Sequence, residues 1–420
     1  MRTRRLLPAA ALAPLVLASA CAAGPDASQE NAPNSLKIAS VATDRASTEA
    51  VIEAFQKANP DVEIETSFAD TDQYQATLRT QLSSGTAPDV FFAWPGNGNP
   101  GAVASIAPDG YLADLSDASW AGKIPDGFRS VTQVDGKTYI LPMTAAGIGA
   151  LYNKEAMEAI GTEPPETWSQ VLDMCSAAQD EGKVAFALGA QTPWVTQLVD
   201  YALAATLVYG ETPDFAERMQ QGDATFTGSA WQTAMEQYLQ MKEEGCFNED
   251  PVGTSFENSL QQVATGDAVA VVQVTSSLNQ LRSQAKDTEF GMFALPATDD
   301  PDETLMPGAA GGAYGANAEA ANPELAERFL DFMAKPESVA LYAETAGALP
   351  GMPTDAYELD PVLAPTQEFQ DSGRTVPFMD QRWPNAEVQS VHLTGVQELL
   401  TGQANPNAVL ADMDDAYTEE

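Results

Sequence analysis

Residues Gly136–Lys154 read GKTYILPMTAAGIGALYNK, and this stretch determines how the rest of the chain is interpreted. Asp135 and Gly136 are turn residues, and the β-branched and aromatic residues after them predict a short strand that ends at Leu141. Pro142 interrupts the apolar run because proline has no N–H to donate to a neighbouring strand. Strand character resumes only after several small residues. A strand broken in this way predicts a connection between two lobes, the first hinge of a two-lobed binding protein.

The segments on either side of this stretch alternate between strand and helix character. Before it, the apolar patterns predict the order β-α-β-α-β, at residues 36–41, 47–58, 62–68, 74–84 and 89–93. That order is typical of an open, mostly parallel sheet with helices on both faces. Strand-like runs meet proline again further on, so two more connections between lobes are expected at 290–296 and 347–350. The predicted fold is α/β with a three-segment hinge; lobe 1 comprises residues 36–141 plus 297–349, and lobe 2 comprises 142–296 plus 350–420.

The chain is strongly acidic. Its 20 Lys and Arg stand against 60 Asp and Glu, which gives a formal net charge of −40. Three of the cations, Arg2, Arg4 and Arg5, lie in the N-terminal leader, so the chain without that leader would carry −43. A negative field of this size repels phosphate backbones and anionic lipid head groups. We therefore expect no nucleic-acid partner, and solubility outside the cell is the plainest reading of the charge.

Residues 1–20 have the organisation of a secretory signal peptide, with an Arg-rich start, an apolar run and a small-residue cleavage site. Cys21 follows directly and resembles the cysteine of a bacterial lipobox, although Ala18 stands where Leu is usual. Lipidation at Cys21 and plain cleavage before it are both open. Residues 21–35 then form a flexible tether. No later apolar run reaches the ~20 residues of a membrane span, so we expect anchoring to the outer face of the cell membrane by lipid alone.

Two further cysteines, Cys175 and Cys246, remain in the exported chain. A disulfide between them is the natural pairing in an oxidising compartment. It would close a loop of roughly 70 residues, which is worth about 4 kcal/mol in the chain-entropy model. His392 is the only histidine in the chain, so we expect no metal site, and we expect no cofactor.

Several segments match one family closely. They are SGTAPDVFFAW (84–94), ILPMTAAGIGALYNKEAMEAIG (140–161), PPETWSQVL (164–172), GDAVAVV (266–272) and NPELAERFLDFMAKPESVALYAETAGALP (322–350). They resemble the extracellular solute-binding proteins of carbohydrate ABC importers, over nearly all of residues 36–417. The resemblance implies a periplasmic-binding-protein-like fold of type II, with the ligand in a cleft between the lobes. It also implies a monomer that delivers a sugar to permease subunits in the membrane.

The chain departs from the family pattern in two places. Many relatives have an aromatic residue at the end of the strand that matches GDAVAVV, where this chain has Gln273, Thr275 and Ser276. The acidic group that commonly follows the hinge proline is replaced by residues 144–147. Both differences leave the identity of the ligand open.

A sugar site needs flat aromatic rings for the C–H faces and planar amides, carboxylates and Arg for the hydroxyls. Trp94 follows a strand at the edge where open α/β sheets bind ligands, although it could instead anchor its own loop. Asp72 is explained equally well as a helix cap, and Arg382 as the partner of an acidic neighbour. The candidate ligand-binding residues are Asp44, Asp72, Trp94, Asn97, Thr144, Trp194, Gln273, Thr275, Gly311, Gly312, Phe378, Arg382 and Trp383.

Three other functions were weighed. A glycoside-active enzyme would need a placed pair of carboxylates, yet no motif marks one, no G-x-S-x-G elbow is present, and packing on a helix explains His392. A non-sugar solute such as a polyamine would require several Asp or Glu beside the aromatic residues of the crevice, whereas the candidate loops carry mostly amides, Trp and Gly. A purely structural surface protein is the third alternative.

Overall fold

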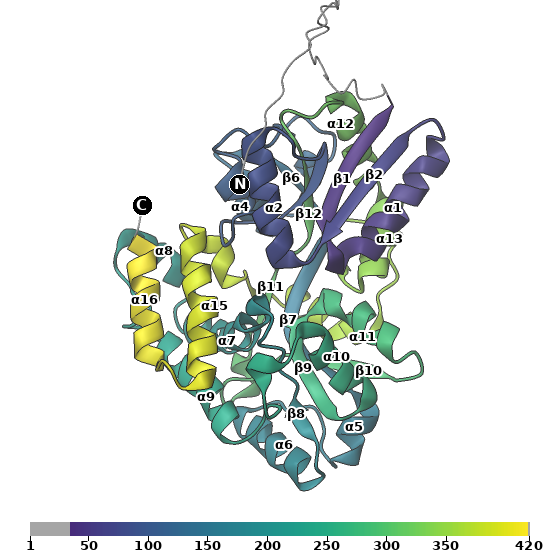
Figure 1. The fold of residues 1–420 in the computed structure, drawn as a ribbon. Helices are drawn as coiled ribbons and strands as arrows, with labels where there is room; N and C mark the ends of the chain where they lie inside the picture. Colours follow the sequence, from purple (N-terminus) through teal and green to yellow (C-terminus); the bar gives the residue numbers. More distant parts are fainter. Residues whose placement is uncertain (1–33, 419–420) are drawn as a thin grey trace, which may run out of the picture.

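Two lobes, each surrounding one β-sheet, make up the computed structural model, which describes residues 34–418 (Figure 1). The predicted signal peptide, Cys21 and most of the predicted tether lie outside the described residues. The two lobes have separate hydrophobic cores. The predicted two-lobed α/β fold is therefore confirmed.

Lobe 1, the upper lobe in Figure 1, contains a five-stranded sheet of order β2-β1-β3-β12-β6. Strand β1 is parallel to β2 and to β3, and β12 runs antiparallel to both of its neighbours. Its strands are β1 (Ser35–Val41), β2 (Glu63–Ala69), β3 (Val90–Ala93), β6 (Ile140–Pro142) and β12 (Ala313–Ala316). Its helices are α1 (Arg45–Ala58), α2 (Thr71–Ser84), α3 (Val103–Ile106), α12 (Pro323–Met333) and α13 (Pro336–Ala346).

A β-hairpin and one short helix precede β6 in the chain. Asp135 and Gly136 both adopt positive φ between β4 (Gln133–Val134) and β5 (Lys137–Thr138). This is the backbone conformation that an Asp-Gly hairpin turn requires, so the predicted turn is confirmed. Helix α4 (Asp126–Thr132) precedes the hairpin and contacts β6 and β11.

Lobe 2 contains a seven-stranded sheet built around β7. Its strands are β7 (Thr144–Asn153), β8 (Val184–Phe186), β9 (Ala268–Val274), β10 (Phe290–Phe293), β11 (Met306–Ala310), β13 (Leu349–Pro350) and β14 (Thr375–Val376). Its helices are α5 (Lys154–Ala159), α6 (Trp168–Asp180), α7 (Gln197–Ala204), α8 (Phe215–Gln221), α9 (Trp231–Glu243), α10 (Phe256–Thr265), α11 (Leu278–Gln284), α14 (Ala364–Asp371), α15 (Ala386–Thr401) and α16 (Pro406–Thr418).

Strand β7 is the longest strand and pairs with different partners along its length. Its first residues pair with β11 and β13, and the rest pairs with β9 and β10. Small residues are required where these partners come close. A Cβ at Gly147 would lie 2.9 Å from the sulfur of Met306, and a Cβ at Gly149 would lie 2.7 Å from the carbonyl oxygen of Phe293.

The chain passes between the two lobes three times. The first passage runs from β6 through Met143 into β7, as predicted, and the third runs from α13 through Ala348 into β13, also as predicted. The second lies at Gly311 and Gly312, between β11 and β12. The expected second passage at 290–296 is therefore wrong.

The error has a physical reason. Proline after strand β10 ends the strand, but the chain then returns along the same sheet as β11, which pairs with β7. Leu295, Ala297 and Met306 accordingly belong to the core of lobe 2. We propose that residues 297–311 be grouped with lobe 2, the rest of the division being unchanged.

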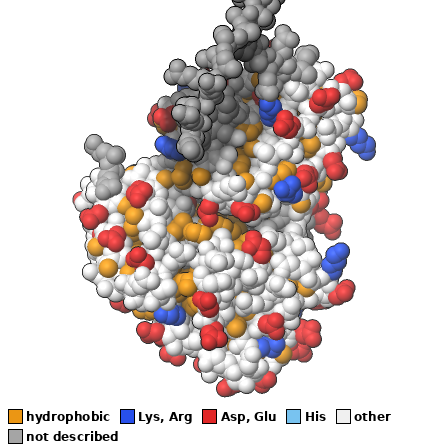
Figure 2. Space-filling view, viewed as in Figure 1, with side chains coloured by type: hydrophobic (Ala, Val, Ile, Leu, Met, Phe, Trp, Pro, Cys, Tyr) orange, Lys and Arg blue, Asp and Glu red, His pale blue; other side chains and the backbone are white. Residues whose placement is uncertain are grey.

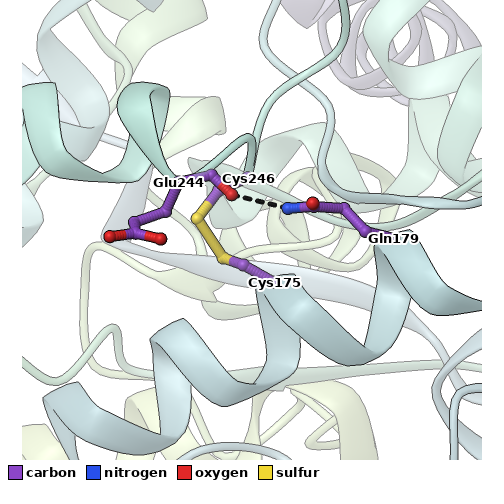
Figure 3. The surroundings of a disulfide bond; sticks show 4 residues. All are labelled: Cys175, Gln179, Glu244 and Cys246. Carbon is purple, nitrogen blue, oxygen red and sulfur yellow. Dashed lines mark hydrogen bonds between the residues drawn. A yellow bond between two sulfur atoms is a disulfide. The ribbon is translucent and has the colours of Figure 1, made fainter.

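The predicted disulfide is present. Cys175 on α6 is bonded to Cys246, which follows α9, with the two Cα atoms 4.8 Å apart (Figure 3). One turn further along α6, the Gln179 side-chain amide donates a hydrogen bond to the carbonyl oxygen of Glu244 at 2.5 Å. The bond thus fixes α6 to the end of α9 inside lobe 2.

The lone histidine is structural, as expected. His392 on α15 is fully buried, and its Nε2 lies 2.8 Å from a carboxylate oxygen of Asp200 on α7. The imidazole is stacked on the ring of Tyr201, with centroids 5.6 Å apart and planes 3° apart. Burial raises the pKa of Asp200, and the hydrogen bond from His392 opposes that change. These contacts join α15 to α7.

Replacing both bonded cysteines, Cys175→Ser with Cys246→Ser, should lower the free energy of unfolding by about 4 kcal/mol, because the unfolded chain regains the entropy of a 71-residue loop. Calorimetric or denaturant unfolding of the oxidised wild type and the variant measures the difference. Wild type treated with a reductant is the control and should match the variant. Equal stability of all three samples would contradict the structural role of the bond.

Candidate binding cleft between the lobes

A cleft with two connected compartments separates the lobes. We call the space around Trp94, Thr144, Tyr201 and Asp380 the inner chamber, and the space around Arg45, Asp72 and Glu257 the outer mouth. Their volumes are about 170 Å³ and about 540 Å³, and Trp194 lines both. In Figure 2 hydrophobic side chains gather near the middle of the visible face, with acidic side chains beside them.

Lobe 1 contributes an aromatic wall. Trp94 directly follows β3 and lies half-buried, with its ring 4.8 Å from that of Phe92 and 5.8 Å from that of Tyr74. Gly101 leaves room for the indole of Trp94, since a Cβ at this position would lie 2.9 Å from the ring. Trp94 therefore packs within its own lobe and also faces the inner chamber, so its roles as loop anchor and as candidate ligand contact are compatible.

Lobe 2 contributes the opposite aromatic wall. Trp194, in the turn before α7, packs on Phe256 with ring centroids 5.0 Å apart and stays partly exposed. Tyr201 from α7 and Phe378, which precedes a short helical turn at Met379–Arg382, complete the wall. Two of the three tryptophans chosen from the sequence thus face one cleft from opposite lobes.

The hinge itself forms the floor of the inner chamber. Thr144 begins β7, and Gly311 and Gly312 form the second passage. The N–H of Gly311 donates to the Thr144 carbonyl oxygen at 2.8 Å, and that of Gly312 donates to the Thr144 hydroxyl at 2.9 Å. The expectation that these N–H groups reach a ligand is therefore wrong, because both are already bonded within the hinge.

Asp44, from the loop after β1, lines the inner chamber. One carboxylate oxygen accepts a hydrogen bond of 2.7 Å from the Tyr342 hydroxyl, and the other accepts one of 3.1 Å from Thr43. Burial raises the pKa of Asp44, against the effect of these two bonds. Asp44 therefore lies where the sequence predicted it.

Asp380 is the second carboxylate of the chamber, and the sequence analysis missed it. It is 9% exposed, and it accepts a hydrogen bond of 2.9 Å from the side-chain amide of Gln389. Its close fit requires Gly98, where a Cβ would lie 2.4 Å from the carboxylate. Burial raises the pKa of Asp380 to about 6.

Amide side chains supply most of the remaining polar lining. Gln381 donates to the carbonyl oxygen of Ala310 at 3.1 Å, and Gln389 also contacts Gln197 at 3.2 Å. The amides of the inner chamber are Gln75, Asn99, Gln197, Gln280, Gln381 and Gln389. Their positions on helices and in loops of both lobes gave no periodic signal, although Asp380 and Gln381 directly follow the chosen residue Phe378.

Three of the chosen residues lie outside the cleft. Trp383 is buried in the core of lobe 2 among Tyr201, Phe226 and Trp231, because its segment turns inward after Met379–Arg382. Arg382 forms an ion pair of 3.1 Å with Glu217, which is the alternative weighed for it. Asn97 bonds Ser105 and the backbone of Pro384 instead of facing the chamber, so it holds the two lobes together beside the cleft.

Gln273 and Thr275 are placed differently from what was expected, whereas Asp72 lies in the cleft. Gln273 is buried in β9 opposite Gly149, and the hydroxyl of Thr275 accepts from the N–H of Gly147 at 3.3 Å. Val274, the next residue of β9, faces the chamber instead, because alternate residues of a strand point to opposite sides, and Ser276 faces it from the helical turn that follows. Asp72 lines the outer mouth, and it is not the cap of α2, since Asp70 occupies that position.

Comparison with known families gives one match over most of the chain. The sequence profile of the family described as bacterial extracellular solute-binding protein matches residues 39–340. In the part of the chain that the structure describes, no group of acidic, His or Cys side chains is arranged to hold a metal ion, and no helix has the length and apolar character to cross a bilayer.

Individual proteins similar to this chain share about a quarter or less of its residues. The chain is similar to the melibiose/raffinose/stachyose-binding protein MelE of Bacillus subtilis, with 25% identity over 79% of this chain and 76% of that protein. It is also similar to the multiple sugar-binding protein of Streptococcus mutans, with 20% identity over 79% and 78%. Among solved structures, the raffinose complex of the solute-binding protein RafE matches with a TM-score of 0.77 and 19% identity, over 91% of this chain and 98% of RafE. At that identity the match shows the fold alone.

The two placements of tryptophan predict different effects on stability. Trp383→Ala should lower the free energy of unfolding by about 3–5 kcal/mol, because it empties a core position. Trp194→Ala should cost about 1 kcal/mol, the central value for point substitutions, because the ring is partly exposed. Denaturant unfolding of both variants measures the difference, and similar losses would contradict the assignment of Trp383 to the core.

Asp380→Asn should change stability in a pH-dependent way. Because the folded pKa of about 6 exceeds the ordinary value of 3.8 for an aspartate, the native state binds the proton more tightly, and wild-type stability falls as the pH rises through this window. The loss is complete above the folded pKa and absent below the unfolded one. Relative to wild type, the Asn variant should therefore gain about 2.4 kcal/mol between pH 4 and pH 7.5, since part of the total of about 3 kcal/mol is already lost at pH 4. Denaturant unfolding at both pH values tests this, and a constant difference would show that the carboxyl does not titrate as described.

Proposed function

This chain belongs to the family of bacterial extracellular solute-binding proteins, and we propose that it captures a sugar or oligosaccharide for an ABC importer and delivers it to the permease. The family consists of extracytoplasmic binding proteins, not enzymes. Sugar as the ligand is supported by the names of the similar proteins, the melibiose/raffinose/stachyose-binding protein among them.

The observation that carries the proposal is the lining of the inner chamber. A neutral sugar presents apolar C–H faces and hydroxyls that both donate and accept hydrogen bonds. Trp94 and Trp194 offer flat apolar surfaces from opposite lobes, and amides such as Gln75 and Gln280 offer both a donor and an acceptor. Few convergent polar groups between apolar walls are the usual composition of a small-molecule site.

Capture by lobe closure follows from the position of the cleft. The lobes are joined by three short passages and touch beside the cleft, where the Asn97 side chain donates to the carbonyl oxygen of Pro384. On the other side, the Asn279 amide from α11 donates to the carbonyl oxygen of Glu344 at the end of α13 at 3.0 Å. A ligand that contacts both walls stabilises the closed arrangement by the difference in its affinity for the closed and open forms.

We extend the proposal to the location and assembly of the protein. Cys21 would carry the lipid that holds the protein at the outer face of the cell membrane, and the protein would act as a monomer with permease subunits and without turning over its ligand. The sequence before Cys21 supports the lipid anchor, and the absence of a recognisable catalytic motif supports binding without turnover.

A panel of neutral mono- and oligosaccharides should contain ligands that raise the melting temperature, since binding to the native state stabilises it by mass action. The same ligands should lower the radius of gyration measured by small-angle X-ray scattering. Trp94→Ala, which removes one wall, is expected to weaken both effects, and Trp120→Phe, in the core of lobe 1 away from the cleft, is the matched control. A tightly bound sugar that leaves the radius unchanged would contradict closure, and release of altered sugar would contradict binding without turnover.

A further inference from the structure

We propose that the sugar bound in the inner chamber carries a positively charged nitrogen, so that this protein is a receptor for an amino sugar. The inference rests on the proposed function and names a ligand class within it. It depends on the charges and hydrogen-bonding groups that surround the chamber.

Two carboxylates face the inner chamber, and no cationic side chain faces them. Asp44 enters from lobe 1 and Asp380 from lobe 2, and among the described residues no Lys, Arg or His lines this compartment. Two basic residues close to Asp380 in the fold have other partners: Arg382 pairs with Glu217, and His392, which acts on Asp380 electrostatically, is bonded to Asp200. A buried carboxylate that has no ion partner is costly unless a partner arrives, and a cationic ligand would be that partner.

The lining of the chamber also includes an acceptor that has no partner in the described part of the chain. The side-chain oxygen of Gln381, a residue more than nine-tenths buried, has no hydrogen-bond partner among the described residues. Tyr342 and Thr43 donate to the carboxylate of Asp44, and Gln389 donates to that of Asp380; these three donors are neutral. An ammonium group has three donors and no acceptor, so it complements this set better than a hydroxyl does.

The aromatic rings and the outer mouth favour the same kind of ligand. Faces of Trp and Tyr attract cations as well as sugar C–H groups, and Trp94, Trp194 and Tyr201 all line the chamber. The outer mouth has one cation, Arg45, against the three acids Asp70, Asp72 and Glu257. An approaching cation would therefore meet negative potential from the mouth inward.

The remaining lining distinguishes an amino sugar from a polyamine. A polyamine offers a flexible chain with donors at intervals and few groups for amides to bind. Six amides surround the chamber, and they suit the many hydroxyls of a sugar ring, which both donate and accept. Asp44 and Asp380 would bind the ammonium, while the amides and rings would bind the rest of the sugar.

Matched sugars test this directly. Glucosamine, galactosamine, mannosamine and the chitosan disaccharide, each with the parent sugar that has a hydroxyl in place of the amine and with the N-acetyl derivative, are added to the neutral panel and measured by calorimetry near pH 7. Within the configuration that binds, the amine form should bind about 10- to 100-fold more tightly than the other two, the range of a hydrogen bond to a charged group.

Variants separate the carboxylates from the overall charge. Asp44→Asn with Asp380→Asn should abolish the preference for the amine, so that the ratio of the two dissociation constants, amine form to parent sugar, approaches one whatever the affinity of the variant for either. Asp109→Asn removes one negative charge from the surface outside both compartments, and it should keep the preference. Thermal unfolding confirms that each variant folds.

The outcomes are distinct. A neutral sugar that binds as tightly as its amine form, or a preference that survives the double variant, overturns this inference and leaves the proposed function standing. Spermidine that binds more tightly than every amino sugar, or a full panel in which no sugar binds, overturns both. An amine preference that is lost equally in Asp109→Asn would assign it to overall charge and also overturn the inference.

Discussion

The constraint on which the rest of the structure depends is the pairing of strand β7, which changes partners along its length. The part that begins at Thr144 is held by β11 and β13, and the part that ends at Asn153 is held by β9 and β10. Each partner brings its backbone close, and only small residues such as Gly147 and Gly149 allow this. Because β11 leads through two glycines to lobe 1 and β13 arrives from it, the strand positions all three passages and with them the floor of the cleft.

Some of the molecule could be predicted from local patterns. The turn at Asp135 and Gly136, the proline break before Thr144 and the alternation of strands and helices depend on residues adjacent in sequence, and the structure contains each of them. The second passage could not be found in this way. A proline ends a strand in the same manner whether the chain then leaves the lobe or turns back along the sheet, and only pairing over a long separation decides between the two.

The cleft shows the same division between local and distant information. Trp94, Asp44 and Trp194 lie in loops that converge on the cleft, so the order of strands and helices was enough to predict their location. Trp383 and Asp380 lie in one short segment. The residue type favoured the tryptophan as a ligand contact, but in the structure its indole packs in the core of lobe 2, and the carboxylate of Asp380 lines the chamber instead. Gln273 and Val274 are adjacent in β9, so their side chains point to opposite faces of the sheet: Gln273 is buried and Val274 faces the chamber.

The disulfide has a consequence for how the lobes move. Both of its sulfur atoms belong to lobe 2, where Cys175 on α6 meets the chain after α9, and no covalent bridge among the described residues crosses the cleft. The disulfide therefore stabilises lobe 2 internally and places no covalent restraint on the movement of one lobe relative to the other. The redox state of the surroundings therefore affects the stability of lobe 2, while the relative position of the lobes depends on the three passages and on the hydrogen bonds between the lobes, such as those of Asn97 and Asn279.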